Sequence, residues 1–245
     1  MADMTGMDLA RAIDMVRASS RLVSFSGAGL SAESGVPTFR DARTGGLWTK
    51  HNPMKLASPA GFIADPELVM AWYADRRRFV ARALPNAAHR ALAARTDMTH
   101  VTQNVDDLLH RAGAAVDRVL QLHGTIARDR CHEACGFEEA VNLAQPPALR
   151  DCPNCGNRLR PSVVWFGESL PPEVWMRAER ACAECDALLV IGTSAEVYPA
   201  AGLIGLARAS GAGIIIVNTQ ASAVSRLADV ELIGPAGEIV PRLLG

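Results

Sequence analysis

The fold of this chain is decided by residues 22–32, which read LVSFSGAGLSA. The first five residues have the apolar character of a buried strand, and the glycines that follow fit the pattern G-x-G-x-x-A. In this pattern Gly27 permits a tight turn, Gly29 lets the backbone approach a pyrophosphate, and the next helix offers free N–H groups. Glycine turns also follow strands in proteins that bind no nucleotide, but the strand-loop-helix context favours a dinucleotide site.

Further strand and helix candidates follow in alternation. An N-terminal helix ends near Ser20, another helix covers 203–209, and strands are predicted at 101–103, 119–122, 163–166, 187–191 and 213–217, with an edge strand at 230–233. Alternating strands and helices are typical of a parallel sheet covered on both faces. We therefore predict an α/β fold, with a Rossmann-like parallel sheet and helices on both faces in residues 1–36, 91–127 and 161–245.

Two stretches interrupt this alternation. Residues 37–90 hold Pro37, Pro53, Pro59 and Pro66 and a charged helical segment near 72–80, and residues 128–160 carry four cysteines. We predict that the first is a helical insertion and the second a zinc-binding module, and that together they form a smaller domain.

The composition is that of a globular protein without a charged partner surface. Of 245 residues, 49% are hydrophobic and 21% charged, and the formal net charge is −1, so neither nucleic acid nor an anionic membrane is expected as a partner. The N-terminus has aspartates where a secretion signal would carry cations, and the apolar runs are strand-sized. Six cysteines in such a chain indicate a reducing compartment, and we expect a cytoplasmic protein.

Four of the cysteines have the spacing of a structural zinc site. They form two glycine-flanked pairs, Cys131 with Cys135 and Cys152 with Cys155. Four thiolates leave no open coordination position, so one structural Zn²⁺ is predicted. His132 could compete as a ligand, but we expect the four thiolates to hold the ion. Cys182 and Cys185 also match C-x-x-C, but no turn residue separates them from helix and strand, so we expect them to pack a helix on the sheet.

Polar residues close several of the predicted strands. A dehydrogenase would carry an acidic residue about 20 positions after the glycine loop, where this chain has Gly45-Gly46-Leu47-Trp48, so hydride transfer is disfavoured. Asn218 and the segment Gly192-Thr193-Ser194 instead stand at strand ends, where ligands bind in open α/β sheets. The segment Gln103-Asn104-Val105-Asp106 and His123 end two more strands. A lone histidine is more often structural than catalytic, but a pKa of about 6.5 suits proton abstraction near neutrality.

The chain resembles the sirtuins in motifs that occur in family order from about residue 20 to the end. They are GAGLSAESGVPTFR at 27–40, TQNVDDL from Thr102, LHG at 122–124, VVWFGE at 163–168, GTS at 192–194 and VYPAAG at 197–202. The resemblance implies an NAD-dependent protein-lysine deacylase, in which the acyl-lysine oxygen attacks C1′ of the nicotinamide ribose. The products are nicotinamide, O-acyl-ADP-ribose and free lysine.

The resemblance also implies roles for single residues. His123 matches the general base, Asn104 the residue that orders the ribose and a water, and Asp106 the one that holds the nicotinamide amide. The cofactor-contacting set that it implies is Gly27, Ala28, Gly29, Ser31, Glu33, Phe39, Arg40, Trp48, Gln103, Asn104, Asp106, Gly192, Thr193, Ser194, Asn218 and Ala236.

The substrate side follows from two further motifs. Tyr73 and Arg76 lie one helical turn apart and resemble the Y-x-x-R of class III sirtuins, which grips the carboxylate of succinyl- or malonyl-lysine, and Ala57 matches a small residue that makes room for it. The backbone of Val163, Val164, Trp165, Phe166 and Gly167 is expected to pair with the substrate peptide. The partner is therefore acylated lysine in proteins, and we expect the enzyme itself to be a monomer.

Departures and rival functions remain. His110 is shifted by one position from the family pattern, and Ser162 stands where many relatives have histidine. Mono-ADP-ribosyl transfer uses the same cofactor, a non-catalytic NAD or acyl-lysine binding module would retain the fold, and a deacetylase need not prefer acidic acyl groups.

Overall fold

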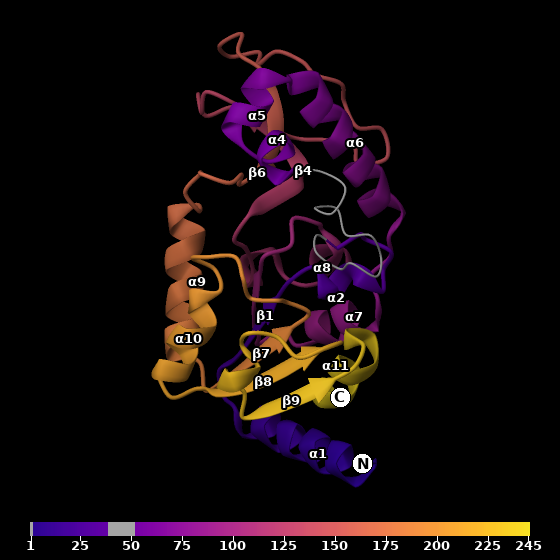
Figure 1. The fold of residues 1–245 in the computed structure, drawn as a ribbon, viewed down its shortest axis with the longest axis vertical. Helices are drawn as coiled ribbons and strands as arrows, with labels where there is room; N and C mark the ends of the chain where they lie inside the picture. Colours follow the sequence, from indigo (N-terminus) through magenta and orange to yellow (C-terminus); the bar gives the residue numbers. More distant parts are fainter. Residues whose placement is uncertain (1, 39–51) are drawn as a thin grey trace.

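The larger part of the molecule is built on a six-stranded parallel sheet. The structure is a computed structural model that describes residues 2–38 and 52–245. The strands are β1 (Leu22–Ser26), β2 (Thr99–Thr102), β3 (Val119–Gln121), β7 (Ala187–Ile191), β8 (Gly213–Asn218) and β9 (Val230–Ile233). They follow the order β3-β2-β1-β7-β8-β9, so the strand order reverses between β1 and β7. Figure 1 labels β1, β7, β8 and β9 of this sheet. Ligands bind at such a reversal in open α/β sheets, and the predicted Rossmann-like sheet is confirmed.

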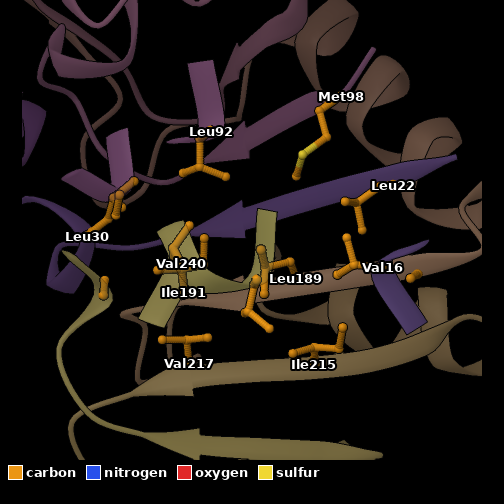
Figure 2. Close-up of a cluster of buried hydrophobic side chains, with 14 of the residues drawn as sticks. Val16, Leu22, Leu30, Leu92, Met98, Leu189, Ile191, Ile215, Val217 and Val240 are labelled. Carbon is orange, nitrogen blue, oxygen red and sulfur yellow. The ribbon is translucent and has the colours of Figure 1, made fainter. Parts of the chain in front are cut away.

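Both faces of this sheet are covered because alternate strand residues are apolar on each side. On one face Leu22, Leu189 and Ile215 pack against α1 (Ala2–Ala18), α7 (Ala87–Ala94) and α11 (Ala236–Leu244) (Figure 2). On the other face Val23, Leu188 and Ile214 pack against α9 (Pro172–Glu184) and α10 (Gly202–Ala209). The two clusters bury the sheet on both faces, and loops leave from its strand ends.

The smaller lobe begins with three helices, each started by a proline. These are α4 (Pro53–Leu56), α5 (Pro59–Ala64) and α6 (Pro66–Arg82), and they lie together above the parallel sheet in Figure 1. The residues before the prolines, Asn52, Ser58 and Asp65, accept N–H groups of the first helical turns. Prolines that looked like interruptions in the sequence are therefore helix starts.

The second part of this lobe is an antiparallel sheet. Its strands β4 (Gly124–Cys131), β5 (Glu138–Ala140) and β6 (Leu159–Val163) follow the order β5-β4-β6. Residues 124–127 and 161–163, which the sequence placed with the parallel sheet, thus belong to this one. The strand predicted at 163–166 is wrong, because β6 ends at Val163 and the amides that follow donate to loops rather than to a strand.

The remaining elements are short. They are α2 (Gly29–Ala32) and α8 (Leu108–Arg111), with 3₁₀ turns at Val116–Arg118 and Ser225–Leu227. Among the described ranges, no helix has the length and apolarity to cross a bilayer. Phe39, Arg40 and Trp48, predicted to contact the cofactor, lie outside the described residues.

Candidate active site

One cleft of about 670 Å³ joins the strand ends of the parallel sheet to the smaller lobe. Its size is within the usual range for ligand sites. The predicted residues that line it are Gly27, Ala28, Gly29, Glu33, Ala57, Tyr73, Arg76, Gln103, Asn104, His123, Val163, Val164, Trp165, Phe166, Gly167, Gly192, Thr193, Ser194, Asn218 and Ala236. All of the predicted substrate residues and most of the predicted cofactor residues, which were inferred from separate motifs, therefore line one cleft.

The glycine loop is held tightly against the end of β7. The amide of Gly27 donates to the Ile191 carbonyl at 3.0 Å, and that of Gly29 to the Gly192 carbonyl at 2.8 Å. A Cβ atom on Gly29 would stand 2.6 Å from the Gly192 Cα, so no larger residue fits. The second glycine thus serves the contact between two loops at the strand reversal, and this contact shapes the floor of the cleft.

His123 follows β3 and is held by one main-chain bond. Its Nδ1 lies 3.1 Å from the Gln103 carbonyl oxygen. A carbonyl can only accept, so Nδ1 carries the proton and Nε2 keeps a lone pair. Burial lowers the pKa of His123, while the bond to Gln103 opposes that shift. The imidazole is therefore neutral at neutral pH and is suited to accept a proton at Nε2.

Asn104, Ser31 and Asp106 form a hydrogen-bonded chain next to the cleft. The Asn104 amide donates to Ser31 Oγ at 3.2 Å, and Ser31 Oγ donates to Asp106 Oδ2 at 2.9 Å. Burial raises the pKa of Asp106. Ser31 and Asp106 are not among the described residues on the cleft wall, so their direct contact with a cofactor stays a prediction, and what the geometry provides is support for Asn104.

Thr193 joins the predicted nucleotide-binding residues. Its hydroxyl accepts from Gln103 Nε2 at 3.0 Å, and its carbonyl accepts from Asn218 Nδ2 at 3.1 Å. Sequence reasoning missed other wall residues, namely Tyr198, residues 219–223 and residues 234–235. The last two groups follow β8 and β9, so the strand-end rule could have found them.

The opposite end of the cleft is formed by α6. Tyr73 and Arg76 are 2% and 8% exposed and both line the cleft, as the spacing predicted. The Trp165 indole N–H donates to Tyr73 Oη at 2.8 Å, and the Arg76 guanidinium lies 4.8 Å from the centre of the Trp72 ring. Burial raises the pKa of Tyr73 and lowers that of Arg76. The phenol is therefore neutral at neutral pH, and the guanidinium stays charged because its ordinary pKa is far above 7.

The segment after β6 is tied into the cleft wall by its amides. Val164 N–H donates to the His123 carbonyl and Phe166 N–H to the Ala57 carbonyl, each at 2.9 Å. Trp165 N–H donates to the Glu168 carboxylate at 2.8 Å. A substrate peptide that pairs with this segment cannot use these three amides. The predicted pairing is therefore limited to the other backbone groups of residues 163–167.

The four predicted metal ligands converge. The thiol sulfurs of Cys131, Cys135, Cys152 and Cys155 all lie within 4.8 Å of one another. The sulfurs of Cys131 and Cys155 are 3.4 Å apart, and those of Cys135 and Cys152 are 3.6 Å apart. Both distances are close to the roughly 3.8 Å between sulfurs that Zn–S bonds of about 2.3 Å give in a tetrahedron. The donors and their spacing fit one structural Zn²⁺, and His132 is not part of the group found among the described residues.

The other C-x-x-C pair is structural packing, as predicted. Cys182 and Cys185 are buried between α9 and the sheet, and Cys185 Sγ donates to the Cys182 carbonyl at 3.2 Å. Burial raises the pKa of Cys182 to about 12 and that of Cys185 to about 11. Both thiols are therefore protonated and unreactive at neutral pH.

Comparison with known proteins gives matches over most of the chain. A family model described as the Sir2 family matches residues 27–199. A Pseudomonas aeruginosa protein named NAD-dependent protein deacylase 1 is 46% identical over 246 residues, which cover 95% of this chain and 96% of that protein. A solved Sir2 homologue in complex with NAD has a TM-score of 0.88 and 42% identity over 96% of this chain and 92% of its own. A Sir2 protein bound to a myristoylated histone peptide has a TM-score of 0.77 and 31% identity, covering 100% and 96%.

Proposed function

The chain belongs to the Sir2 family and is an NAD-dependent protein deacylase, and we propose that it removes succinyl and malonyl groups, besides acetyl groups, from lysine side chains. The observation that carries the acyl preference is the pair Tyr73 and Arg76 on the cleft wall. Relatives have been solved with NAD and with an acylated histone peptide, which supports acyl-lysine in proteins as the substrate.

The charge of Arg76 favours an acidic acyl group at this end of the cleft. Arg76 lines the cleft, is 8% exposed and keeps its positive charge at neutral pH, so this end of the cleft favours a ligand that carries a negative charge. A planar guanidinium suits a carboxylate, which it can bind through two parallel hydrogen bonds. An acetyl group offers no charge to this part of the cleft, whereas a succinyl or malonyl group ends in a carboxylate that Arg76 and Tyr73 can both bind.

The nucleotide side of the cleft suits NAD. The loop Gly27–Gly29, Thr193, Ser194 and Asn218 would hold it, in line with the strand reversal between β1 and β7. When bound, NAD supplies an electrophilic ribose carbon and nicotinamide as the leaving group. His123 accepts a hydroxyl proton at Nε2 while its Nδ1–H stays on the Gln103 carbonyl. Asn104, steadied by Ser31, would order the ribose.

Steady-state kinetics of one variant tests the acyl preference. Arg76→Met should raise KM for a succinyl-lysine peptide by roughly a hundredfold, as expected for a lost charge-assisted pair, and should change KM for the acetyl peptide far less. Arg78→Met is the matched control, since Arg78 is on the same helix and is 47% exposed in a surface pair with Asp75. Equal losses for both peptides would remove the acyl proposal and leave a deacylase without acidic preference.

We also propose a location and an oligomeric state for the enzyme. All six cysteines are free of disulfides, which fits a reducing compartment, and we place the enzyme in the cytoplasm as a monomer.

The rival activity, transfer of ADP-ribose to protein, would appear as a mass increase of the protein, without O-acyl-ADP-ribose among the products.

A further inference from the structure

The Trp165 side chain lies in the wall of the cleft and is held by contacts with several neighbours. It is 2% exposed, and its ring centre lies 5.4 Å from that of Phe62. The guanidinium of Arg160 stacks 3.9 Å from the indole ring and pairs with the Glu168 carboxylate, which also accepts the Trp165 amide. Backbone and side chain of Trp165 are thus held by one group of contacts, so its indole N–H points in one direction.

The indole N–H of Trp165 fixes the hydrogen-bonding role of the Tyr73 hydroxyl. Indole nitrogen is a donor only, so in the 2.8 Å contact with Tyr73 Oη the tyrosine must be the acceptor. A phenol has a single proton, and this proton cannot point back at the indole. Tyr73 lines the cleft beside Arg76, so an acceptor that a ligand brings into the cleft can receive this proton.

We propose that Trp165 is a specificity-determining positioning residue, whose indole N–H occupies the acceptor side of the Tyr73 hydroxyl and directs the phenolic proton to the carboxylate of an acidic acyl group. This inference rests on the acyl preference proposed above and adds a residue to it. Burial keeps Tyr73 protonated at neutral pH, so the proton to be directed is present. An acetyl group has no terminal acceptor to receive it, so the effect should be confined to acidic acyl groups.

A double-mutant cycle on Trp165 and Tyr73 tests the coupling. Trp165→Phe keeps an aromatic ring but removes the donor, and it should lower the ratio of succinyl to acetyl kcat/KM by roughly three- to tenfold, the effect of one hydrogen bond. In the Tyr73→Phe background the same change should leave the ratio within about twofold. Trp175→Phe is the control for losing an indole, because Trp175 lies in α9 and packs against the hydrophobic cluster between the parallel sheet and helices α9 and α10. An equal drop in both backgrounds would overturn the proposal.

A second measurement does not depend on deacylation. In ¹⁵N spectra the indole N–H resonance of Trp165 should move upfield in Tyr73→Phe, because the acceptor is lost while Trp165 remains in a folded protein. An unmoved resonance would overturn the proposed bond. If the resonance moves but the wild-type enzyme shows no succinyl preference, the function proposed for the pocket fails while the hydrogen bond stands, so the two failures are distinguishable.

Discussion

His123 Nδ1 lies 3.1 Å from the main-chain carbonyl oxygen of Gln103, and this contact sets the tautomer of the imidazole. The carbonyl belongs to the segment that follows β2, whereas His123 follows β3. Two neighbouring parallel strands therefore orient the base through a main-chain acceptor. Burial keeps the imidazole neutral although the bond to the carbonyl opposes this shift, whereas a carboxylate partner would raise the pKa of the histidine more strongly.

The pH dependence of turnover should report this histidine. Burial lowers the pKa of His123 below the ordinary value of about 6.5, and a base must be unprotonated to act. We expect kcat/KM, which reports ionisations of the free enzyme, to be constant through neutral pH and to fall only below that value. His123→Ala should reduce kcat by roughly 10²- to 10⁴-fold, the usual contribution of a general base. An acid limb centred above 6.5, or one that persists in His123→Ala, would contradict this role.

Zinc should be required for the fold of the small lobe and not for the chemistry. We expect about one zinc ion per chain by elemental analysis, since four thiolates complete one tetrahedral site. Cys135→Ser should lower the zinc content and the melting temperature together, because metal binding is coupled to folding. Cys182→Ala is the control. This variant should keep the full zinc content, because Cys182 is not part of the four-cysteine group. Full zinc loading in Cys135→Ser would show that another residue completes the site.

Breaking the buried ion pair between α6 and β4 should strongly destabilise the smaller lobe. Arg77 Nη2 lies 2.5 Å from Asp129 Oδ1, and both side chains are 0% exposed. Asp129→Asn leaves the buried cation without a counter-charge and should lower the free energy of unfolding by about 3–5 kcal/mol. Asp75→Asn removes a surface pair and should cost less than about 1 kcal/mol. Denaturant titration measures both, and similar small losses would contradict the assignment.

Two buried histidines should make the fold acid-sensitive. Burial lowers the pKa of His89 and of His100 to about 4, whereas an unfolded histidine titrates near 6.5. Between these values the unfolded state binds more protons, so stability is full above about 6.5 and is lost as the pH falls toward 4. His100→Gln should make the plot of unfolding free energy against pH shallower in this window. An unchanged slope would show that His100 does not contribute.

Most of the parallel sheet could be predicted, since its signals are local. The segments 22–26 and 187–191 are apolar runs followed by glycine, and the structure has strands with those bounds. The run VVWF at 163–166 misled because an apolar loop and an apolar strand have the same composition. Its amides donate to His123, Ala57 and Glu168, partners that are distant or follow the run, so no strand pattern reveals them.

The site was predictable where a motif carried it and not where tertiary contacts made it. The spacing of Tyr73 and Arg76 placed both on one helix face, and the structure has them on one wall. The bond from Trp165 to Tyr73 joins positions 92 residues apart and leaves no periodic signal. The segment 219–223, Thr-Gln-Ala-Ser-Ala, lines the cleft without any side chain of distinctive chemistry.

The most direct test of the central claim is the ratio of kcat/KM for succinyl-lysine and acetyl-lysine on the same peptide, measured with NAD and with mass spectrometry of peptide and nucleotide products. We predict NAD-dependent release of both groups, with the succinyl peptide preferred and O-acyl-ADP-ribose formed in equal amount. Turnover of the acetyl peptide alone would contradict the role assigned to Tyr73 and Arg76.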